Sequence, residues 1–398
     1  MTRTAPSLCL AAVLPLLAPE AAAQPAAPDN GQPQQALPAD PSTRAFDLLR
    51  TGDLAGAMAL LDQALAGNPA DGSSRLLRAT ILAKFGHAQE ALADGEALVA
   101  NDALDPDAWT MRGRARLMLG ALDGALADAD TALRLAPGFA EALQLRGDVL
   151  FERMDPAAAV TDYMTFLQQV DPRDPEVRGR LAAALCDLGR ADEALEALAP
   201  ALALFPDDLD LLMTEAETLR TLGRFGEAQA AIDHAFAVAP ADPRLRFARA
   251  RLAVADGRLD EAMADLRAML AAWPGQLQAE DLACVIAARR RDADRAQCRR
   301  DQAARTAPLP RDQAQHQALL AGIAMLEGDD AEARRALDAA LLLNPRHPIA
   351  AWLDGVLRGQ GGDDDGARRA FARARMLRPD AALVTEAMFG PALAPGAR

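Results

Sequence analysis

Histidine and cysteine, the side chains that most often bind metals or act as catalysts, are scarce in this sequence. Its four histidines, His87, His234, His316 and His347, form no H-E-x-x-H motif and have no Cys-x-x-Cys partner. No G-x-S-x-G elbow, Walker loop or dinucleotide-binding fingerprint occurs either. The sequence therefore predicts a protein that is not an enzyme, with no catalytic residues, no metal and no cofactor. Each histidine is expected on the surface or in a packing seam.

The cysteines provide one candidate cross-link. Cys186, Cys284 and Cys298 follow residue 23, and an odd number in an oxidising compartment leaves at least one thiol free or bonded to another chain. Cys284 and Cys298 fall on the two helices of one repeat unit, at heights that should face each other. We expect a disulfide between them or, if the helical phase turns Cys298 outward, separate thiols. Cys186 is expected to be a small buried or groove-wall residue.

An acidic run at 361–366, Gly-Gly-Asp-Asp-Asp-Gly, raises the question of a calcium site. It lacks the alternating ligand spacing and the distant glutamate of an EF-hand loop. The segment 328–332, Gly-Asp-Asp-Ala-Glu, holds the same place one repeat earlier. Acidic side chains there would face the positive N-terminus of the following helix, so we interpret both runs as helix starts.

The elements that carry these residues follow a repeat. A turn glycine and an alanine five residues later recur every 34 residues, except for spacings of 35 after Met154 and 37 after Arg291, whose extra residues are expected in loops. Most units also have a proline seventeen residues after the turn, where it ends a helix. Each unit is therefore expected to be two helices and two turns. The pairs are Gly52/Ala57, Gly86/Ala91, Gly120/Ala125, Gly189/Ala194, Gly223/Ala228, Gly257/Ala262, Gly328/Ala333 and Gly362/Ala367; Met154/Ala159 and Arg291/Ala296 keep the spacing without the glycine.

One unit, residues 106–139, has Trp109, Gly113, Gly120, Ala125, Ala132 and Pro137 at the signature positions of a known repeat. The chain resembles the tetratricopeptide repeat (TPR) family over about residues 38–381. The resemblance implies an all-α, right-handed superhelical solenoid of about ten helix-turn-helix repeats, in which small residues let paired helices meet and neighbouring units share a core. The expected repeats are about 38–71, 72–105, 106–139, 140–174, 175–208, 209–242, 243–276, 277–310, 314–347 and 348–381.

Three further segments flank the repeats. Arg3, an apolar run at 8–18 and three alanines at 21–23 are typical of a bacterial secretory signal, so we expect cleavage after Ala23. The alternative is a buried or anchoring segment, but the run is shorter than the roughly 17 residues that span a bilayer. Residues 24–41 are expected to be a disordered tether rich in Pro, Gln and Ala, and 382–398 a capping helix and tail. The mature protein would then be periplasmic or secreted, without stable membrane insertion.

The net charge of −15 argues against nucleic acid as a partner. A basic patch in the eighth unit departs from this acidic background. It is either a docking patch for an acidic partner or lipid head groups, or a solvated face balanced by neighbouring acidic residues. The patch consists of Arg289, Arg290, Arg291, Arg295, Arg299 and Arg300.

The resemblance also implies where a partner would bind. Ligands of TPR proteins usually enter the concave face lined by the first helix of each unit. The corresponding residues here mix charges with apolar anchors, which suits a protein or peptide ligand; the alternative is that they only solubilise this face. We therefore expect a non-catalytic scaffold or adaptor in envelope protein assembly, secretion or maturation, or else an accessory subunit of an envelope polysaccharide synthesis or export machine. The expected groove residues are Arg114, Met118, Gln144, Asp148, Phe151, Arg180, Met213, Glu217, Arg220, Phe247 and Arg251.

Overall fold

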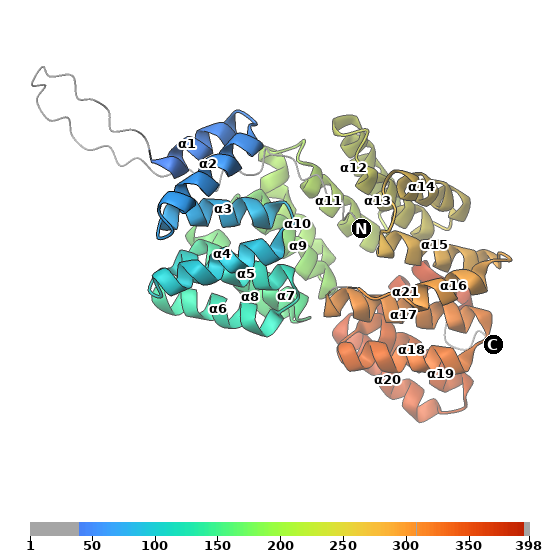
Figure 1. Cartoon of the computed structure of the whole chain (residues 1–398). Helices are drawn as coiled ribbons and strands as arrows, with labels where there is room; N and C mark the ends of the chain where they lie inside the picture. The colour runs from blue at the N-terminus through green and yellow to red at the C-terminus, as the bar shows by residue number, and fades with distance from the viewer. Residues whose placement is uncertain (1–39, 308, 394–398) are drawn as a thin grey trace, which may run out of the picture. The chain divides into compact units, whose positions relative to one another are not determined.

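The computed structural model describes residues 40–393 except Pro308 (Figure 1). The expected signal at 1–23, nearly all of the tether at 24–41 and the end of the tail at 394–398 lie outside the described residues. Within the described part of the chain, the regular elements are twenty-one α-helices and a 3-10 helix at Pro391–Leu393, with no strand. The expected all-α solenoid of helical repeats is thereby confirmed.

Twenty of the helices form ten consecutive pairs. The first helices are α1 (Pro41–Arg50), α3 (Gly72–Lys84), α5 (Pro106–Met118), α7 (Ala140–Glu152), α9 (Pro175–Asp187), α11 (Leu209–Thr221), α13 (Pro243–Ala255), α15 (Leu277–Arg290), α17 (Pro310–Glu327) and α19 (Pro348–Gln360). The second helices are α2 (Leu54–Gly67), α4 (Ala88–Asn101), α6 (Leu122–Leu135), α8 (Pro156–Gln169), α10 (Ala191–Leu204), α12 (Phe225–Val238), α14 (Leu259–Ala272), α16 (Arg295–Ala303), α18 (Asp330–Leu343) and α20 (Asp364–Leu377). A last helix, α21 (Ala381–Phe389), follows the tenth pair.

The turn between the two helices of each repeat has a fixed backbone conformation. All eight glycines that set the repeat frame have φ between +71° and +86°, in the left-handed region that glycine adopts without steric strain. Met154 and Arg291, which replace the glycine in two units, have φ of 64° and 59°. The left-handed turn is therefore kept even where a side chain makes it unfavourable, which shows that helix pairing determines it.

Small residues let the paired helices approach closely. A Cβ atom at Gly355 of α19 would lie 2.6 Å from the ring of Phe371 on the paired helix α20, and one at Gly113 of α5 would lie 3.1 Å from Asp128 Cβ on the paired helix α6. Nine of the ten alanines five residues after the turns are buried, Ala57 and Ala125 completely, and the exception is Ala296 in the irregular eighth repeat. The glycine and alanine signature is thus explained by packing at distances that a larger side chain would prevent.

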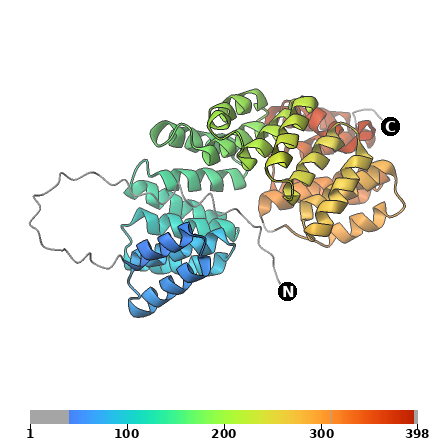
Figure 2. The same cartoon turned by 90° about the horizontal axis from the view of Figure 1, so that it is seen from above.

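The chain divides into two compact units, residues 1–145 (unit 1) and 146–398 (unit 2). Within each unit, successive helices lie side by side in chain order, and each second helix packs on the first helix of its own repeat and of the next (Figures 1 and 2). The largest core cluster lies in unit 2, where Met325, Leu337 and Leu353 of α17, α18 and α19 are fully buried. Each repeat thus completes its core with its neighbours.

An arginine–aspartate clamp joins the two helices in several repeats, and the sequence analysis did not identify it. Arg112 of α5 donates from Nε and Nη2 to the two carboxylate oxygens of Asp128 on α6, at 3.0 and 2.6 Å, and Asp128 is 2% exposed. The same fork, also 16 residues apart, joins Arg78 to Asp94, Arg146 to Asp162 and Arg249 to Asp265. The recurring 16-residue spacing was the signal that could have revealed it. Bidentate pairing fixes the two helices in one register.

The eighth repeat is irregular. Its second helix, α16, has nine residues, whereas the other second helices have fourteen, and a disulfide between Cys284 and Cys298 joins α15 to α16 with a Cα–Cα distance of 5.7 Å. The extra residues of the 37-residue spacing extend the next helix: α17 has eighteen residues and begins at Pro310, before the expected repeat start at 314. The expectation that this insertion lies in a loop was wrong, since Pro310 at the start of α17 is compatible with a helix N-terminus.

The acidic run at 361–366 begins a helix, as interpreted. Asp363 is the N-cap of α20 and accepts a hydrogen bond from the backbone N–H of Gly366 at 2.8 Å. Asp329 does the same for α18, where it accepts from the N–H of Glu332 at 3.1 Å. The N-terminal N–H groups of these helices are therefore satisfied by side-chain carboxylates.

Candidate functional site

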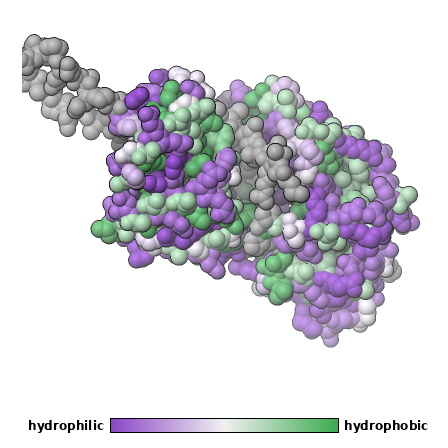
Figure 3. All heavy atoms as spheres, viewed as in Figure 1, coloured by the Kyte–Doolittle hydropathy of each residue, from purple (hydrophilic) through white to green (hydrophobic). Residues whose placement is uncertain are grey.

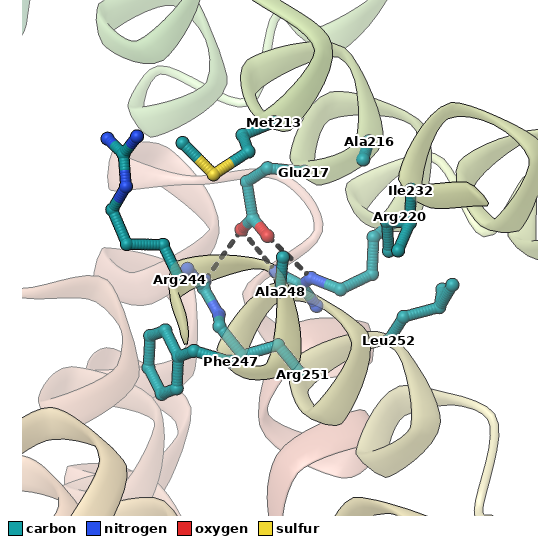
Figure 4. A pocket seen from close by; sticks show the side chains of 10 residues that line it. All are labelled: Met213, Ala216, Glu217, Arg220, Ile232, Arg244, Phe247, Ala248, Arg251 and Leu252. Atoms are coloured by element: carbon teal, nitrogen blue, oxygen red, sulfur yellow. Dashed lines mark hydrogen bonds and ion pairs between the residues drawn. The ribbon is translucent and has the colours of Figure 1, made fainter. Parts of the chain in front are cut away.

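A pocket of about 250 Å³ lies in unit 2 between α11 and α13, the first helices of the sixth and seventh repeats. Figure 4 shows Glu217 pointing toward Arg220 and Arg251, with Phe247 and Met213 beside them. One side of the pocket is therefore charged and another is apolar. The lining residues are Met213, Ala216, Glu217, Arg220, Ile232, Arg244, Phe247, Ala248, Arg251 and Leu252.

The 34-residue period brings the charged groups together. Glu217 and Arg251 hold equivalent positions on consecutive first helices, and Arg251 Nη2 donates to Glu217 Oε1 at 2.6 Å. Arg220, one turn after Glu217 on α11, donates to both carboxylate oxygens at 2.9 and 2.6 Å. The Arg251 guanidinium also lies 5.8 Å from the centroid of the Phe247 ring. Two arginines from different repeats therefore share one carboxylate.

Two arginines keep Glu217 ionised. Burial alone would raise the pKa of Glu217, but Arg220 and Arg251 outweigh it and lower that pKa to about 2. For Arg251, the charge of Glu217 opposes deprotonation, yet burial and the nearby charges of Arg220 and Arg378 lower its pKa. Arg220 and Arg251 thus share the carboxylate of Glu217, while Arg378 pairs with Asp380 and Asp187 also acts on Arg251.

A second charged cluster lies on the first helices of the fourth and fifth repeats. Asp148 of α7 accepts a hydrogen bond from the Tyr163 hydroxyl at 2.7 Å and pairs with Arg180 of α9. Arg180 also donates to Glu176 at 2.6 Å. Burial is the main cause that raises the pKa of Tyr163 well above its usual range, so this hydroxyl stays protonated and acts as a donor to Asp148. These polar groups bind one another.

Later repeats of unit 2 contact the first helices of the fourth and fifth repeats. Arg311 of α17 pairs with Asp187 of α9, and its guanidinium lies 3.7 Å from the centroid of the Phe151 ring. Farther along, Pro379 lies so close to Gly189 that an added Cβ would be 2.7 Å from the proline Cδ. Segments more than 120 residues apart in sequence thus meet, and the later repeats cover part of the face that the sequence predicted as an open groove wall.

The predicted groove residues divide into three groups. Met213, Glu217, Arg220, Phe247 and Arg251 line the pocket; Asp148, Phe151 and Arg180 belong to the contacts just described; and Arg114, Met118 and Gln144 lie in unit 1. Gln144 is buried, and Met118 is 38% exposed.

Arg244 also lines the pocket and was missed by the sequence analysis. It pairs at 2.9 Å with Asp210, which lies one repeat earlier on the neighbouring first helix. A comparison of charges one repeat apart along the first helices was the signal that could have found it.

The basic patch of the eighth repeat is divided among separate intramolecular contacts. Arg289 donates to backbone carbonyls of α13 and α21, Arg290 pairs with Asp260 at 2.9 Å, and Arg299 pairs with Glu327 and Asp329 at 2.7 and 3.0 Å. Arg295 donates to the backbone oxygens of Asp292 and Arg291, and Arg300 to Gln297. Arg291 is the left-handed C-cap of α15. Arg289 and Arg299 are thus held in internal contacts, which neither interpretation of the patch predicted.

Two of the four histidines are buried in seams of unit 2. His316 of α17 places Nδ1 2.8 Å from Asp281 Oδ2 and Nε2 3.2 Å from the Gln302 carbonyl oxygen, while His347 is the N-cap of α19. His87 and His234 are at the surface, near Glu90 and Asp207. Cys186 is buried, and burial is the main cause that raises its pKa to about 11. No group of three or more His, Cys, Asp or Glu residues that could hold a metal occurs in the described part of the chain.

None of the helices in residues 40–393 combines the length and apolar character that a bilayer crossing requires. Figure 3 shows a mostly hydrophilic surface over the C-terminal repeats α18–α20. Large apolar side chains exposed there include Leu342, Leu343 and Met376. Some exposed apolar residues are normal on the surface of a folded protein.

Ten consecutive helix pairs stacked through shared cores define a helical-repeat fold. Two family models, both for tetratricopeptide repeats, match the chain. One matches residues 43–106, 76–140, 145–208 and 327–382, together more than half of the chain, and the other matches 187–252. The chain belongs to the tetratricopeptide repeat family, as its turn spacing predicted. Neither model matches residues 253–326, which include the irregular eighth repeat.

A solved structure supports this fold. A tetratricopeptide repeat protein from Parabacteroides merdae ATCC 43184 is similar over 61% of this chain and 96% of its own, with 22% identity and a TM-score of 0.50. A thermophilic TPR protein of Thermus thermophilus has 29% identity over 45% of this chain and 97% of its own, with a TM-score of 0.42. YrrB, a TPR protein with an unusual peptide-binding site, has 20% identity over 46% of this chain and 93% of its own, with a TM-score of 0.35. No curated protein sequence matches the chain.

Proposed function

We propose that this protein is a non-catalytic scaffold that binds a protein or peptide partner on the first-helix face of unit 2, at the pocket between α11 and α13. TPR proteins are generally interaction scaffolds without catalytic activity, which supports the class of function. The observation that carries the site is the shared ion pair of Glu217 with Arg220 and Arg251 beside the apolar surface of Phe247 and Met213. Such a combination supplies both an anchor and a polar orienting group for a peptide side chain.

The ligand that this pocket favours is a peptide segment with a carboxylate next to an apolar side chain. Arg220 and Arg251 share the carboxylate of Glu217, so an incoming Asp or Glu would compete with Glu217 for charge-assisted hydrogen bonds from these two arginines. Phe247 would cover the neighbouring apolar group. The pocket would in this way select a ligand that carries a negative charge at that point.

We further propose that the protein acts in the periplasm, in the assembly, secretion or maturation of another exported protein. Support comes from the arrangement of Arg3, the apolar run at 8–18 and the alanines at 21–23, which is typical of a cleaved export signal. The Cys284–Cys298 disulfide is compatible with an oxidising compartment. Fractionation of cells followed by N-terminal sequencing tests this proposal: a periplasmic form that starts at Gln24 is expected, and an uncleaved cytoplasmic form would refute it.

A screen of the purified protein against a library of unstructured peptides tests the binding site. We expect bound peptides to be enriched in Asp or Glu next to an apolar residue, and amide substitution of the acidic residue to weaken binding by about tenfold or more, as the loss of a charge-assisted hydrogen bond would. Arg251→Ala should weaken binding similarly. Arg267→Ala, at an exposed position on α14 of the same repeat, is the matched control. Equal binding by both variants would exclude the pocket as the site.

A further inference from the structure

The last helix, α21, lies on the first helices of unit 2 and does not simply extend the stack of repeats. It contacts α19 and α20, which precede it, and also α13, α15 and α17, and Figure 1 shows it between α15 and α17. Helices α13, α15, α17 and α19 are all first helices of their repeats. We call the surface that they present to α21 the α21 groove.

One face of α21 is fully buried in this groove. Ala381, Thr385 and Phe389, spaced four residues apart, are 0–1% exposed, and Leu393 beyond the helix is also buried. Leu383 on the opposite face is 69% exposed. The helix therefore docks through a single stripe of residues, which is how an amphipathic helical ligand lies in a groove.

Phe389 fits a socket made by a glycine. A Cβ atom at Gly322 of α17 would lie 2.3 Å from Cε1 and Cζ of the Phe389 ring, so the ring rests directly on the backbone of α17. A glycine in the middle of a helix is unfavourable by about 1 kcal/mol relative to alanine. Its presence at position 322 is explained by the aromatic ring that it admits.

The groove also binds the end of the docked helix. Arg289 of α15 donates from Nη1 to the carbonyl oxygens of Ala387 and Met388 at 3.0 Å each, and to the Val254 carbonyl of α13 at 3.3 Å. The last carbonyls of a helix have no partner within the helix, so a cation placed there satisfies them. This contact requires only a helix C-terminus and depends on no particular side chain of α21.

The segment that leads into α21 runs beside the pocket. Arg378 pairs with Asp380 at 2.9 Å, the charge of Asp380 acts on Arg220, and Pro379 contacts Gly189. The chain therefore passes the edge of the pocket between α11 and α13 just before α21 begins.

We propose that the α21 groove is a helix-binding surface whose internal occupant is α21, and that a partner binds there by presenting a short helix in place of α21. The partner helix would carry small or apolar residues at every fourth position and an aromatic residue in its last turn, for the Gly322 socket. Its free C-terminal carbonyls would be bound by Arg289. This surface is distinct from the proposed peptide pocket, so either proposal can fail while the other stands.

The test uses the full-length protein and a labelled synthetic peptide of residues 379–393 as the probe. Phe389→Ala in the protein should release α21, with amide hydrogen exchange of residues 381–389 faster by at least about tenfold because a fully buried aromatic side chain is lost. The released groove should then bind the probe at least about tenfold more tightly than the wild-type protein, where α21 occupies it. Leu383→Ala, on the exposed face, is the matched control and should change neither measurement.

Two further variants separate docking from a folding defect. Adding Gly322→Ala to the Phe389→Ala protein closes the socket and should abolish binding of the probe, and a probe with the same Phe389→Ala change should not bind to the released groove. Arg289→Ala removes the groove side chain that binds the C-terminal carbonyls of α21, and it should likewise accelerate amide hydrogen exchange in residues 381–389. Unchanged exchange in both release variants would overturn the proposal. So would a released groove that fails to bind the probe or binds it regardless of Gly322.

Discussion

Protonation of His347 is expected to destabilise unit 2 at acidic pH. His347 is the N-cap of α19: its Nδ1 accepts the N–H of Ala350 at 3.2 Å, and Nε2 lies 3.1 Å from Gln315 Oε1. Burial and, secondarily, the charge of Arg311 lower its pKa to about 4. Protonation at Nδ1 would remove the acceptor for the Ala350 N–H and place a charge in a seam where His347 is 6% exposed.

The sign and size of the effect follow from linkage. As pH falls, the unfolded chain, with an ordinary histidine pKa near 6.5, takes up the proton before the folded chain does. The free energy of unfolding should therefore decrease between about pH 6.5 and pH 4, with the full loss present below pH 4. The difference between the unfolded and folded pKa values of His347 corresponds to a loss of about 3 kcal/mol in the free energy of unfolding.

Urea unfolding followed by circular dichroism from pH 7 to pH 4 measures this loss. His347→Asn keeps a good N-cap acceptor and has no titrating ring. Between pH 7 and pH 4, the variant should therefore lose about 3 kcal/mol less of its free energy of unfolding than the wild type does. His87→Asn changes the exposed N-cap of α4 in the same way and is the matched control. If wild type and His347→Asn lose stability equally, His347 is not the group responsible.

Three further predictions concern the repeats themselves. The Cys284–Cys298 disulfide closes a loop of about fifteen residues, and its reduction should lower the free energy of unfolding by about 3 kcal/mol. Urea unfolding with and without reductant measures this change. An unchanged unfolding midpoint would mean that the bond does not stabilise the eighth repeat. Asp128→Ala leaves two partly buried arginines without their carboxylate and should lower the free energy of unfolding by about 3–5 kcal/mol. Asp62→Ala removes an exposed carboxylate that pairs with Arg78 and should lower it by less than about 1 kcal/mol. Equal losses in the two variants would contradict the role given to the clamp. Met154→Gly should stabilise the fourth repeat by about 1 kcal/mol because φ of 64° is strained for a residue with a Cβ, and a lower melting temperature would show that its side chain contributes more than the strain removes.

The sequence predicted the repeats well because their turns are a local and recurrent signal. Each glycine marks a left-handed turn, and the same turn is kept at Met154 and Arg291, with the buried Ala159 five residues after the first of them. The N-cap role of Asp363 was equally readable, since it depends on residues within one turn of helix. Local geometry and a fixed period were enough for both.

The candidate site was only partly predictable because it depends on contacts between distant repeats. Met213 and Phe247 could be placed on first helices from the period alone, but the contact of Arg311 with Phe151 joins the ninth repeat to the fourth. Such contacts depend on the small rotation between successive repeats, which accumulates along a solenoid and has no local sequence signal. For the same reason α21 could be expected as a capping helix but not as the occupant of a groove.

Site-specific photocrosslinking in living cells tests the central claim, that a partner binds on the first-helix face of unit 2, most directly. A photoreactive residue at Phe247 in the pocket, with one at Arg267 on the second helix of the same repeat as control, should capture one exported protein from the pocket position only. That protein's acidic segment should then bind to the purified wild type and lose affinity for Arg251→Ala. Capture of the same proteins from both positions, or of none from the pocket while the protein is folded, would contradict the account.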